Sequence, residues 1–374
     1  MIKEYVKNNL NELYSLIYDL CHIPAPSHYE EKRAEYIKAW FDKNGMREAY
    51  IDEALNVIFP YQAERCDSLT VFAAHTDTVF PDTQPMPYYD DGEYIRCPGV
   101  GDNTASVAVI MLTAKYFTEN SIKTNGVLFV LNSCEEGLGN LKGVRRVFSD
   151  FAGRVKRFIS YDSFKMNRVS DRCVGSHRYE VEVLTEGGHS YNAFGNKNAI
   201  AELSKIVNEI YSTVLPEKEG RRVTYNVGEI SGGTSVNTIA QSAKMLCEYR
   251  SDDIELLSFM KVRFEKIFKN AETDGVKLNV KLIGERPCAG DVDASSEEEL
   301  KLIAADALRA VTGEEIKFTS ASTDCNIPLS LGIPAICIGV YNGYGAHTRE
   351  EYLEKASLIK GFELGVYAAV MFSE

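Results

Sequence analysis

Short, continuously apolar segments alternate with longer amphipathic segments along much of the chain. Apolar runs of about 4–8 residues are typical of strands that are covered on both faces of a sheet, and the amphipathic segments have the periodicity of helices. The alternation of the two predicts an α/β fold in which a sheet is flanked by helices. The predicted strands with the most continuous apolar pattern are residues 69–75, 126–136, 155–162 and 334–342.

Two helical patterns precede the first of these strands. The second contains the sequence SHYE, in which Ser27 and Glu30 have the spacing of a capping box. In a capping box the two side chains bind the free backbone N–H groups at the start of a helix. The motif therefore predicts that Ser27 and Glu30 cap the second helix.

The pattern changes between residues 173 and 287. Strands in this region alternate apolar and polar residues, as in HRYEVEVL, and the predicted order is strand, helix, strand, strand, helix, strand. This is the order of a ferredoxin-like α+β sandwich. The first pattern resumes near residue 288 with a helical segment at 295–313. We therefore predict one domain formed by residues 1–172 and 288–374, with residues 173–287 inserted into it as a second domain.

The composition is compatible with two such domains and narrows the class of partner. The chain has 374 residues, of which 45% are hydrophobic, enough to build a core in each domain. Its 54 acidic and 41 basic residues give a net charge of -13, without a long block of either sign. This charge argues against a nucleic-acid or anionic-membrane surface and favours a small-molecule or peptide partner.

Localisation and cysteine chemistry are the next properties that the sequence indicates. The first twenty residues are amphipathic and charged, unlike a signal peptide, and we expect no apolar stretch of the about 20 residues that a membrane span requires. These observations predict a cytoplasmic protein. The nine cysteines include no CxxC pair, which argues against both a disulfide framework and a thiolate zinc site.

Acidic and histidine residues follow the predicted strands at the points where the strands end. Ligands gather at the carboxyl ends of strands in open α/β sheets, because the loops converge there. The residues in question are His75 and Asp77, Glu135 and Glu136, Asp162, His347 in the loop after residues 334–342, and Asp102 at the start of a long predicted helix.

Each of these residues alone has an ordinary explanation as a helix cap, a turn former or a solvated loop residue. Together, with no basic residues between them, the acids would repel one another unless a cation lay among them. Histidine and carboxylate donors without thiolates suit Zn²⁺, although Mn²⁺ or Co²⁺ accepts the same ligands. Five donors with one shared carboxylate suit a centre of two metal ions.

Two pairs of neighbouring residues have separable roles. Asp77 lies on the same side of its strand as His75, where it is placed to orient the imidazole or a neighbouring ligand. Glu135 and Glu136 are adjacent and point in different directions, so one is expected to bind a metal and the other to face the substrate as a general base.

In this order and spacing, the motifs resemble those of the M20 family of dinuclear zinc metallopeptidases, and the resemblance covers nearly the whole chain. It implies a zinc-exopeptidase-like mixed sheet flanked by helices, with an inserted lid and dimerisation domain. The motifs that resemble the metal site are HTDTV, GVGDNTASVAVIM, CEEGLGNLKG, YDS and AHTREE, and those that resemble the lid are GGHSYNAFG and ISGGTSVNTIAQSAKMLCEYRSDD.

The resemblance implies a role for each site residue. Asp102 would bridge two metals, His75 and Asp162 would complete one site, and Glu136 and His347 would complete the other. Glu135 would be the general base. His189 would stabilise the oxyanion, in dimeric members from the partner subunit. Asn237, Arg250 and Arg286 would bind substrate, with the planar fork of Arg250 holding a carboxylate.

These features predict a cytoplasmic di-zinc exopeptidase that resembles the peptidase T-type aminopeptidases acting on di- or tripeptides. A metal-bridged hydroxide would attack the peptide carbonyl, with Glu135 taking the proton. An N-acyl amino-acid deacylase of the acetylornithine or succinyl-diaminopimelate kind is the alternative, and a catalytically inactive binding protein of the same fold is a weaker one. The sequence SASTDCN, which includes Asp324, departs from the glycine-rich segment of many relatives, so the pocket there is expected to differ. A homodimer through residues 173–287 is also predicted.

Overall fold

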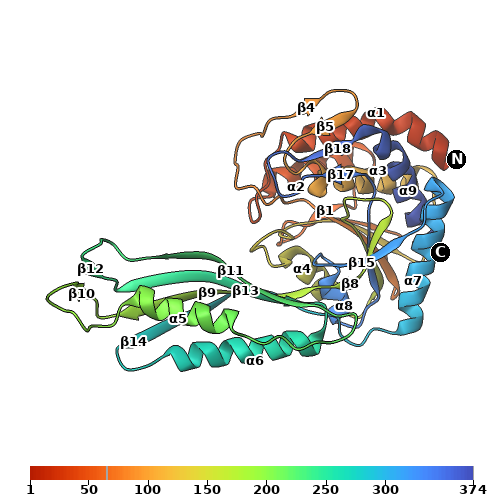
Figure 1. Ribbon diagram of the computed structural model, residues 1–374. Coiled ribbons are helices and arrows are strands. Elements are labelled where there is room, and N and C mark those ends of the chain that lie inside the picture. Colours follow the sequence, from red (N-terminus) through yellow and green to blue (C-terminus); the bar gives the residue numbers. More distant parts are fainter. Residues whose placement is uncertain (65, 374) are drawn as a thin grey trace. The chain divides into compact units, whose positions relative to one another are not determined.

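The computed structural model describes residues 1–64 and 66–373. The chain divides into two structural units (Figure 1). Unit 1 is formed by Met1–Cys173 and Gly290–Glu374, and unit 2 by Val174–Ala289. The sequence analysis placed the corresponding limits at residues 173 and 287.

Unit 1 is built on a mixed eight-stranded sheet (Figure 1). Its four central neighbours, β6, β3, β7 and β16, run parallel to one another, while β2 and β8 pair with them in the antiparallel direction. The four central strands are the four that the apolar pattern predicts, and the predicted α/β class is confirmed. In sheet order the strands are β1 (Tyr50–Ile51), β2 (Val57–Tyr61), β6 (Val127–Asn132), β3 (Leu69–His75), β7 (Val155–Tyr161), β16 (Ala335–Ile338), β8 (Arg168–Cys173) and β15 (Lys317–Ala321).

Helices cover both faces of this sheet. On one face α1, α3 and α9 pack against one another and α7 packs against α9, around buried rings that include Phe72, Phe129 and Tyr161. On the other face α4 and α8 are in contact, and Phe148 of α4 packs against Phe158 of β7. The helices of unit 1 are α1 (Ile2–Cys21), α2 (Glu31–Lys43), α3 (Ser106–Glu119), α4 (Lys142–Asp150), α7 (Ala294–Thr312), α8 (Asn326–Ser330) and α9 (Lys355–Ser373).

A second, smaller sheet in unit 1 carries two of the predicted site segments. The loop between β17 and β18 contains His347, and β5 leads into an irregular turn, Val100–Ala105, that contains Asp102 and precedes α3. Its strands are β17 (Gly343–Tyr344), β18 (Tyr352–Glu354), β5 (Tyr94–Arg96) and β4 (Tyr89–Asp90). The pairing of β18 with β5 therefore connects these two distant parts of the chain.

Unit 2 has the predicted order of strands and helices. Its antiparallel sheet has the order β11-β13-β9-β14, and α5 and α6 pack against one face, around Tyr179, Met245 and Phe264. A short pair, β10 (Gly188–His189) and β12 (Thr238–Ile239), adds a two-stranded sheet. The main elements are β9 (Gly175–Thr185), α5 (Ala199–Tyr211), β11 (Val223–Gly232), β13 (Ser242–Ser251), α6 (Ile254–Ala271) and β14 (Val276–Arg286).

The predicted capping box is wrong. Helix α2 begins at Glu31 with Glu30 at its N-cap position, and no side chain caps it. The Ser27 hydroxyl instead donates to Asp77, and the Glu30 carboxylate accepts from the Cys134 amide. Both side chains are used for contacts with distant segments, which local sequence spacing cannot reveal.

Helix α9 corrects the expectation that the chain contains no apolar stretch of membrane-spanning length. Its length and mean hydropathy of 1.2 satisfy that criterion. However, 61% of its most apolar 18-residue stretch is buried inside the protein, and Phe362, Val366 and Phe372 belong to the main core. Core packing therefore accounts for its apolar character.

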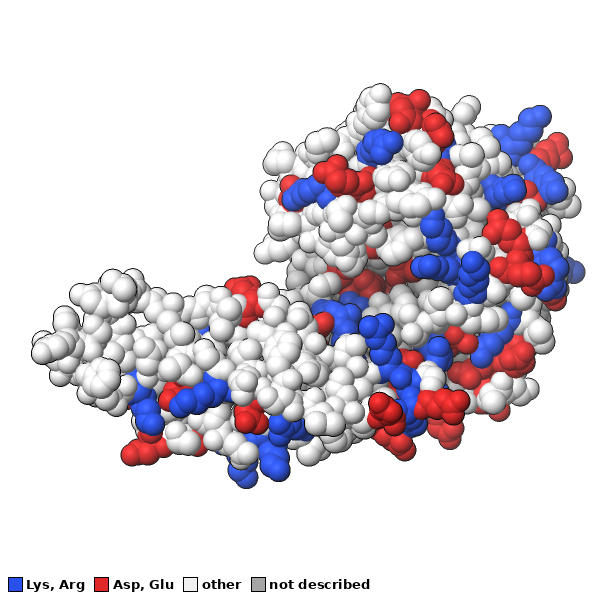
Figure 2. Space-filling model, viewed as in Figure 1, with Lys and Arg blue, Asp and Glu red and all other residues white. Residues whose placement is uncertain are grey.

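The charged residues drawn in Figure 2 are of mixed sign, and the described cysteines are not paired in disulfides. On the face drawn in Figure 2, the described acidic and basic residues form small groups of both signs rather than one broad patch. All nine cysteines are free thiols, and all except Cys66 are buried. A disulfide framework is therefore absent from the described residues.

Close packing of α9 against the strand end at Val340 generates a stability prediction. A Cβ atom added at Gly361 would overlap the backbone oxygen of Val340, which cannot move as a flexible side chain would. Overpacking in a core costs about 1–3 kcal/mol, and a backbone obstruction belongs at the upper end of that range. We therefore expect Gly361→Ala to lower the free energy of unfolding by about 3 kcal/mol, measured by denaturant titration. Lys360→Ala, at an exposed neighbouring position, is the control; equal stability of the two variants would contradict the packing argument.

Candidate metal centre

Parallel pairing of the central strands places several predicted residues at one edge of the sheet. His75 ends β3 and is in register with Asn132 at the end of β6, while Asp162 directly follows β7. Glu135 and Glu136 follow β6 by three and four residues. The same strand polarity thus carries these side chains to a common place.

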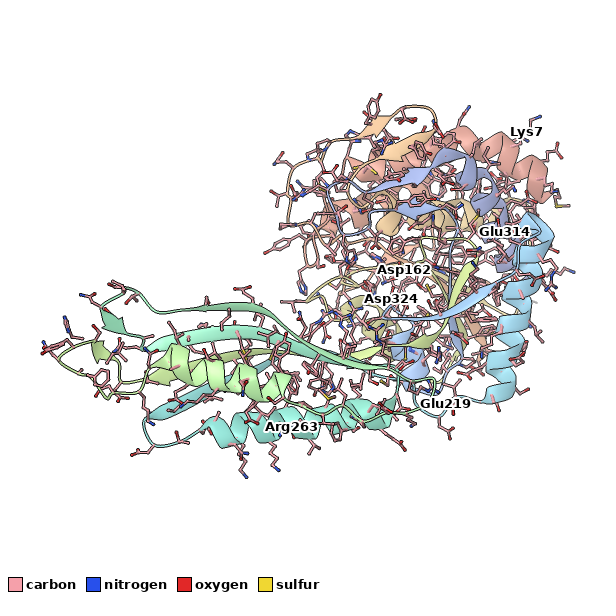
Figure 3. All side chains as sticks on the ribbon, viewed as in Figure 1. Lys7, Asp162, Glu219, Arg263, Glu314 and Asp324 are labelled. Atoms are coloured by element: carbon pink, nitrogen blue, oxygen red, sulfur yellow. The ribbon has the colours of Figure 1, made fainter. Side chains whose placement is uncertain are left out.

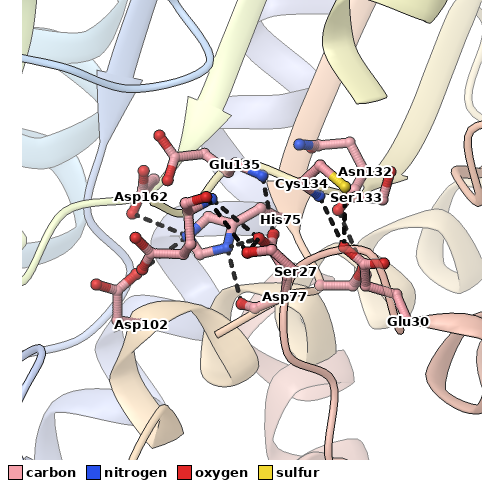
Figure 4. Close-up of polar contacts among 12 residues, drawn as sticks. Ser27, Glu30, His75, Asp77, Asp102, Asn132, Ser133, Cys134, Glu135 and Asp162 are labelled. Atoms are coloured by element: carbon pink, nitrogen blue, oxygen red, sulfur yellow. Dashed lines mark hydrogen bonds and ion pairs between the residues drawn. The ribbon is translucent and has the colours of Figure 1, made fainter. Parts of the chain in front are cut away.

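The structure brings the five predicted ligands together in two groups that share Asp102. In the first group, His75 Nε2 lies 3.0 Å from Asp102 Oδ1 and 3.8 Å from Asp162 Oδ1 (Figure 4). In the second, His347 Nε2 lies 3.0 Å from Asp102 Oδ2 and 3.3 Å from Glu136 Oε1. The two oxygens of Asp102 therefore face different histidines.

These separations fit the donor set of a metal centre. Metal–nitrogen and metal–oxygen bonds are about 2.0–2.2 Å long, so two donors on one tetrahedral ion lie about 3.4 Å apart. The distances of 3.0–3.8 Å between the paired donors lie around this value. One atom each of His75, Asp102 and Glu136 also lies within 4.8 Å of the others, so these three buried residues alone could hold an ion.

The grouped side chains shift one another's pKa values. Hydrogen bonds to Asp102 and Glu136 raise the pKa of His347 to about 10. Burial lowers the pKa of His75, but hydrogen bonds with Asp102, Asp162 and Asp77 outweigh it and the net shift is upward. Burial and the charge of Asp102 raise the pKa of Glu136 to about 8. Imidazoles bind a metal in their neutral form, so binding of a cation here would be accompanied by release of protons.

Asp77 supports the turn that carries the two glutamates. Its Oδ1 and Oδ2 each accept a hydrogen bond of 2.9 Å, from the Glu135 and Glu136 amides respectively (Figure 4). Ser27 donates to Oδ2 at 2.6 Å. His75 Nδ1 is 3.1 Å from the backbone oxygen of Asp77 and 3.4 Å from its carboxylate. Asp77 thus contacts His75 through both its backbone and its side chain, and it organises the neighbouring turn as well.

Comparison of the sequence with known protein families identifies the family of this chain. The sequence model of peptidase family M20/M25/M40 matches residues 71–370. The chain belongs to this family. The predicted family and its hydrolase class are therefore confirmed.

Relatives of this M20 chain include proteins with different named activities. Its fold is similar to aminopeptidase PepT from Bacillus cereus, with a TM-score of 0.75, 19% identity and coverage of 97% and 98% of the two chains. It is also similar to a tripeptidase from Staphylococcus aureus, with a TM-score of 0.76, 20% identity and coverage of 96% and 98%. A putative succinyl-diaminopimelate desuccinylase from Mycobacterium tuberculosis is 23% identical over 356 residues, which are 92% of this chain and 94% of that protein.

Glu351 is a supporting residue of the M20 site to which sequence reasoning assigned no role. Its Oε1 accepts hydrogen bonds of 2.8 Å from the Gly101 and Asp102 amides, and its Oε2 accepts one of 2.7 Å from the Gly99 amide. Burial and the charge of Asp102 raise the pKa of Glu351 to about 7. The available signal was its position in HTREE, four residues after His347.

Asp324 is a further buried acid beside the site. It is fully buried, and its Oδ2 accepts a 2.8 Å hydrogen bond from the Asn132 side chain. Burial and the negative charge of Glu135 raise its pKa well above the ordinary value. The negative charge of Asp162 also contributes to the raised pKa of Asp324; both residues are labelled in Figure 3. This residue lies in the segment whose sequence departs from the family pattern, where a different pocket is expected.

The four predicted residues of unit 2 fall into two separate places. His189 on β10 and Asn237 lie together, because the amide after His189 donates to the Asn237 carbonyl at 2.9 Å. Arg250 and Arg286 lie on strands either side of β9, both in register with Ser176. Arg250 makes two hydrogen bonds of 2.7 and 3.0 Å to Glu248.

The contacts of Glu351 generate a prediction about metal affinity. Removing a group that holds a ligand-bearing segment typically weakens metal binding by about 10–100-fold. We expect Glu351→Ala to have this effect, because three amides around Asp102 lose their acceptor. The measurement is metal affinity in competition with a chelator. Glu350→Ala, at an exposed adjacent position, is the control; equal affinity in both variants would show that Glu351 does not support Asp102.

Proposed function

We propose that this M20 chain is a di-zinc exopeptidase that hydrolyses short peptides of two or three residues. The observation that carries the proposal is the double use of Asp102, whose two oxygens face His75 and His347. A shared carboxylate between two histidine-containing groups supports a centre of two metal ions. Similarity to the Bacillus cereus aminopeptidase and the Staphylococcus aureus tripeptidase supports the choice of substrate.

The ligand set proposed for the metals uses only nitrogen and oxygen donors. His75 and Asp162 would hold one ion, Glu136 and His347 the other, and Asp102 both. Such donors suit Zn²⁺, and they also accept Mn²⁺ or Co²⁺. When bound, the ions supply Lewis-acid polarisation of a carbonyl and lower the pKa of a water molecule.

Glu135 has the position proposed for the general base. It is 4% exposed, and the turn that carries it is held by Asp77 through the Glu135 amide. Its neighbour Glu136 is directed to His347, which leaves the two carboxylates with separate tasks. Glu135 would accept a proton from the attacking water and return it to the nitrogen of the leaving amine. Asp77, by fixing the backbone of both glutamates, would keep these tasks apart.

Unit 2 is proposed to contribute substrate binding and dimerisation. His189 would stabilise negative charge on the substrate oxygen, and Asn237 would bind close to it. Arg250 and Arg286 would bind a substrate carboxylate, and a substrate bound to the Arg250 fork would compete with the hydrogen bonds of Arg250 to Glu248. We also propose that the protein is cytoplasmic; the burial of α9 in the core argues against a membrane span by that helix.

The proposed activity predicts which substrates are cleaved and which residue is required. The metal-loaded protein should release amino acids from a panel of di- and tripeptides, with slower cleavage of N-acetyl and N-succinyl amino acids. Glu135→Gln keeps the side-chain shape but removes the base, so kcat should fall by about 10²–10⁴-fold. Both are measured by following the released amine.

Metal content measured by elemental analysis is the control for the Glu135→Gln variant. Near-normal turnover at full metal content would refute the role of Glu135. Preferential cleavage of the N-acyl amino acids would instead favour the deacylase alternative, which the similarity to the desuccinylase makes worth testing. If the metal-loaded protein hydrolyses none of these substrates, the result would favour the other alternative, a catalytically inactive binding protein of the same fold.

Dimerisation through unit 2 predicts the mass in solution. Light scattering coupled to size exclusion should give about twice the 41.8 kDa of one chain. A mass of one chain at all concentrations would refute the dimer, and it would also exclude a role for His189 across subunits.

A further inference from the structure

Two buried carboxylates hold three successive backbone N–H groups beside the metal centre. Glu30 Oε1 accepts from the Cys134 amide at 2.9 Å, and the two oxygens of Asp77 accept from the Glu135 and Glu136 amides, also at 2.9 Å (Figure 4). Every amide of this short segment is thus bound by a carboxylate oxygen. The direction of both glutamate side chains depends on the backbone that these contacts fix.

The segment needs such contacts because its first residue has an unfavourable conformation. Cys134 has φ +57°, in the left-handed region that residues other than glycine rarely adopt. Residues in this region are strained and persist only where their surroundings hold them. On the carbonyl side, the Leu141 amide donates to the Cys134 oxygen at 3.0 Å. On the amide side, the holding contact is Glu30.

Glu30 is used for this contact in preference to capping its own helix. It is fully buried, and among the described residues its hydrogen bonds to distant groups go to the Cys134 amide and to Cys134 Sγ, at 3.3 Å. Burial and the charge of Asp77 raise the pKa of Glu30. A buried carboxylate is costly, so its retention requires compensating interactions.

Arg33 supplies part of that compensation one helical turn further along α2. Its guanidinium is buried and donates to the carbonyl groups of Leu20, Ile23 and Thr76 at 2.7–3.1 Å. Thr76 lies between His75 and Asp77, so Arg33 holds the backbone of the segment that carries these two site residues. The positive charge of Arg33 also interacts with Asp77 and Glu30. Helix α2 therefore supports both strand ends, although it precedes residue 71, where the family match begins.

We propose that Glu30 is a positioning residue for the reaction: through the Cys134 amide it fixes the backbone that directs the Glu135 carboxylate toward the substrate. This inference rests on the proposed function of Glu135 as general base. The reaction requires that the side chain at position 30 place an acceptor oxygen within hydrogen-bond distance of the Cys134 amide. Its negative charge is secondary, because the contact is made to a backbone amide.

Three substitutions at this position separate reach from charge. Glu30→Gln keeps an acceptor at the same distance, so kcat should remain within about threefold of the wild-type value. Glu30→Asp keeps the charge but is one methylene shorter, and Glu30→Ala lacks the acceptor. Both should lower kcat by about 10–100-fold with little change in KM or metal content, because small misplacement of a catalytic group has effects of this size. Glu31→Gln, at an exposed adjacent position on α2, is the matched control.

Hydrogen exchange of the segment 133–137, followed by mass spectrometry, gives a readout that does not depend on activity. Exchange should become faster in Glu30→Ala and Glu30→Asp, and stay at the wild-type rate in Glu30→Gln. If Glu30→Ala does not fold, the comparison of Glu30→Gln with Glu30→Asp still shows whether the length or the charge of the side chain matters. Adding Cys134→Gly to a folded Glu30→Ala variant should restore part of kcat, because glycine adopts positive φ without the same cost.

Several results would overturn the proposal. These are a wild-type kcat in Glu30→Ala, an active Glu30→Asp with an inactive Glu30→Gln, or losses of kcat that follow metal content. Full activity of Glu135→Gln would refute the proposed base instead, and the exchange rates would still report whether Glu30 holds the segment. The two failures are therefore distinguishable.

Discussion

Repulsion among buried carboxylates is the constraint on which the rest of unit 1 depends. Parallel strands bring acids to one edge of the sheet, where several of them are almost completely removed from water. Each is accommodated in its own way. Asp102 lies between two imidazoles, Asp77 is surrounded by backbone amides, and Asp324 has a strongly raised pKa. Bound cations would remove the repulsion that these arrangements only reduce.

Apolar packing and polar support have different sources in this fold. The core under α1, α3 and α9 fixes the position of the central strands and therefore the place where they end. The polar groups that shape the site come from elsewhere: Ser27 and Glu30 precede α2, and Glu351 lies at the end of the loop that contains His347. The site thus depends on segments that contribute little to the sheet itself.

Sequence reasoning predicts the parts of this structure that are periodic or that end strands. The central strands and the order of elements in unit 2 could be read from apolar periodicity, and the candidate residues His75, Asp102, Glu135, Glu136, Asp162 and His347 from their places in the chain. Only the resemblance to M20 peptidases assigned a particular role to each of the two glutamates. The supporting contacts could not be predicted in this way. Ser27 and Glu30 have the local spacing of a capping box, but their partners lie at least fifty residues away. Long-range hydrogen bonds leave no periodic signal, so the contact of Glu30 with Cys134 was visible only in three dimensions, and Glu351 had no signal beyond its nearness to His347.

The position of β16 has a consequence for how the protein is made. This strand lies between β7 and β8 in the sheet, although it follows them by more than one hundred and fifty residues in the chain. A ribosome-bound chain that has emerged only as far as unit 2 has a gap in the middle of its sheet, and His347 is still to be synthesised. The candidate metal centre therefore cannot assemble until the segment from β16 to His347 has been synthesised.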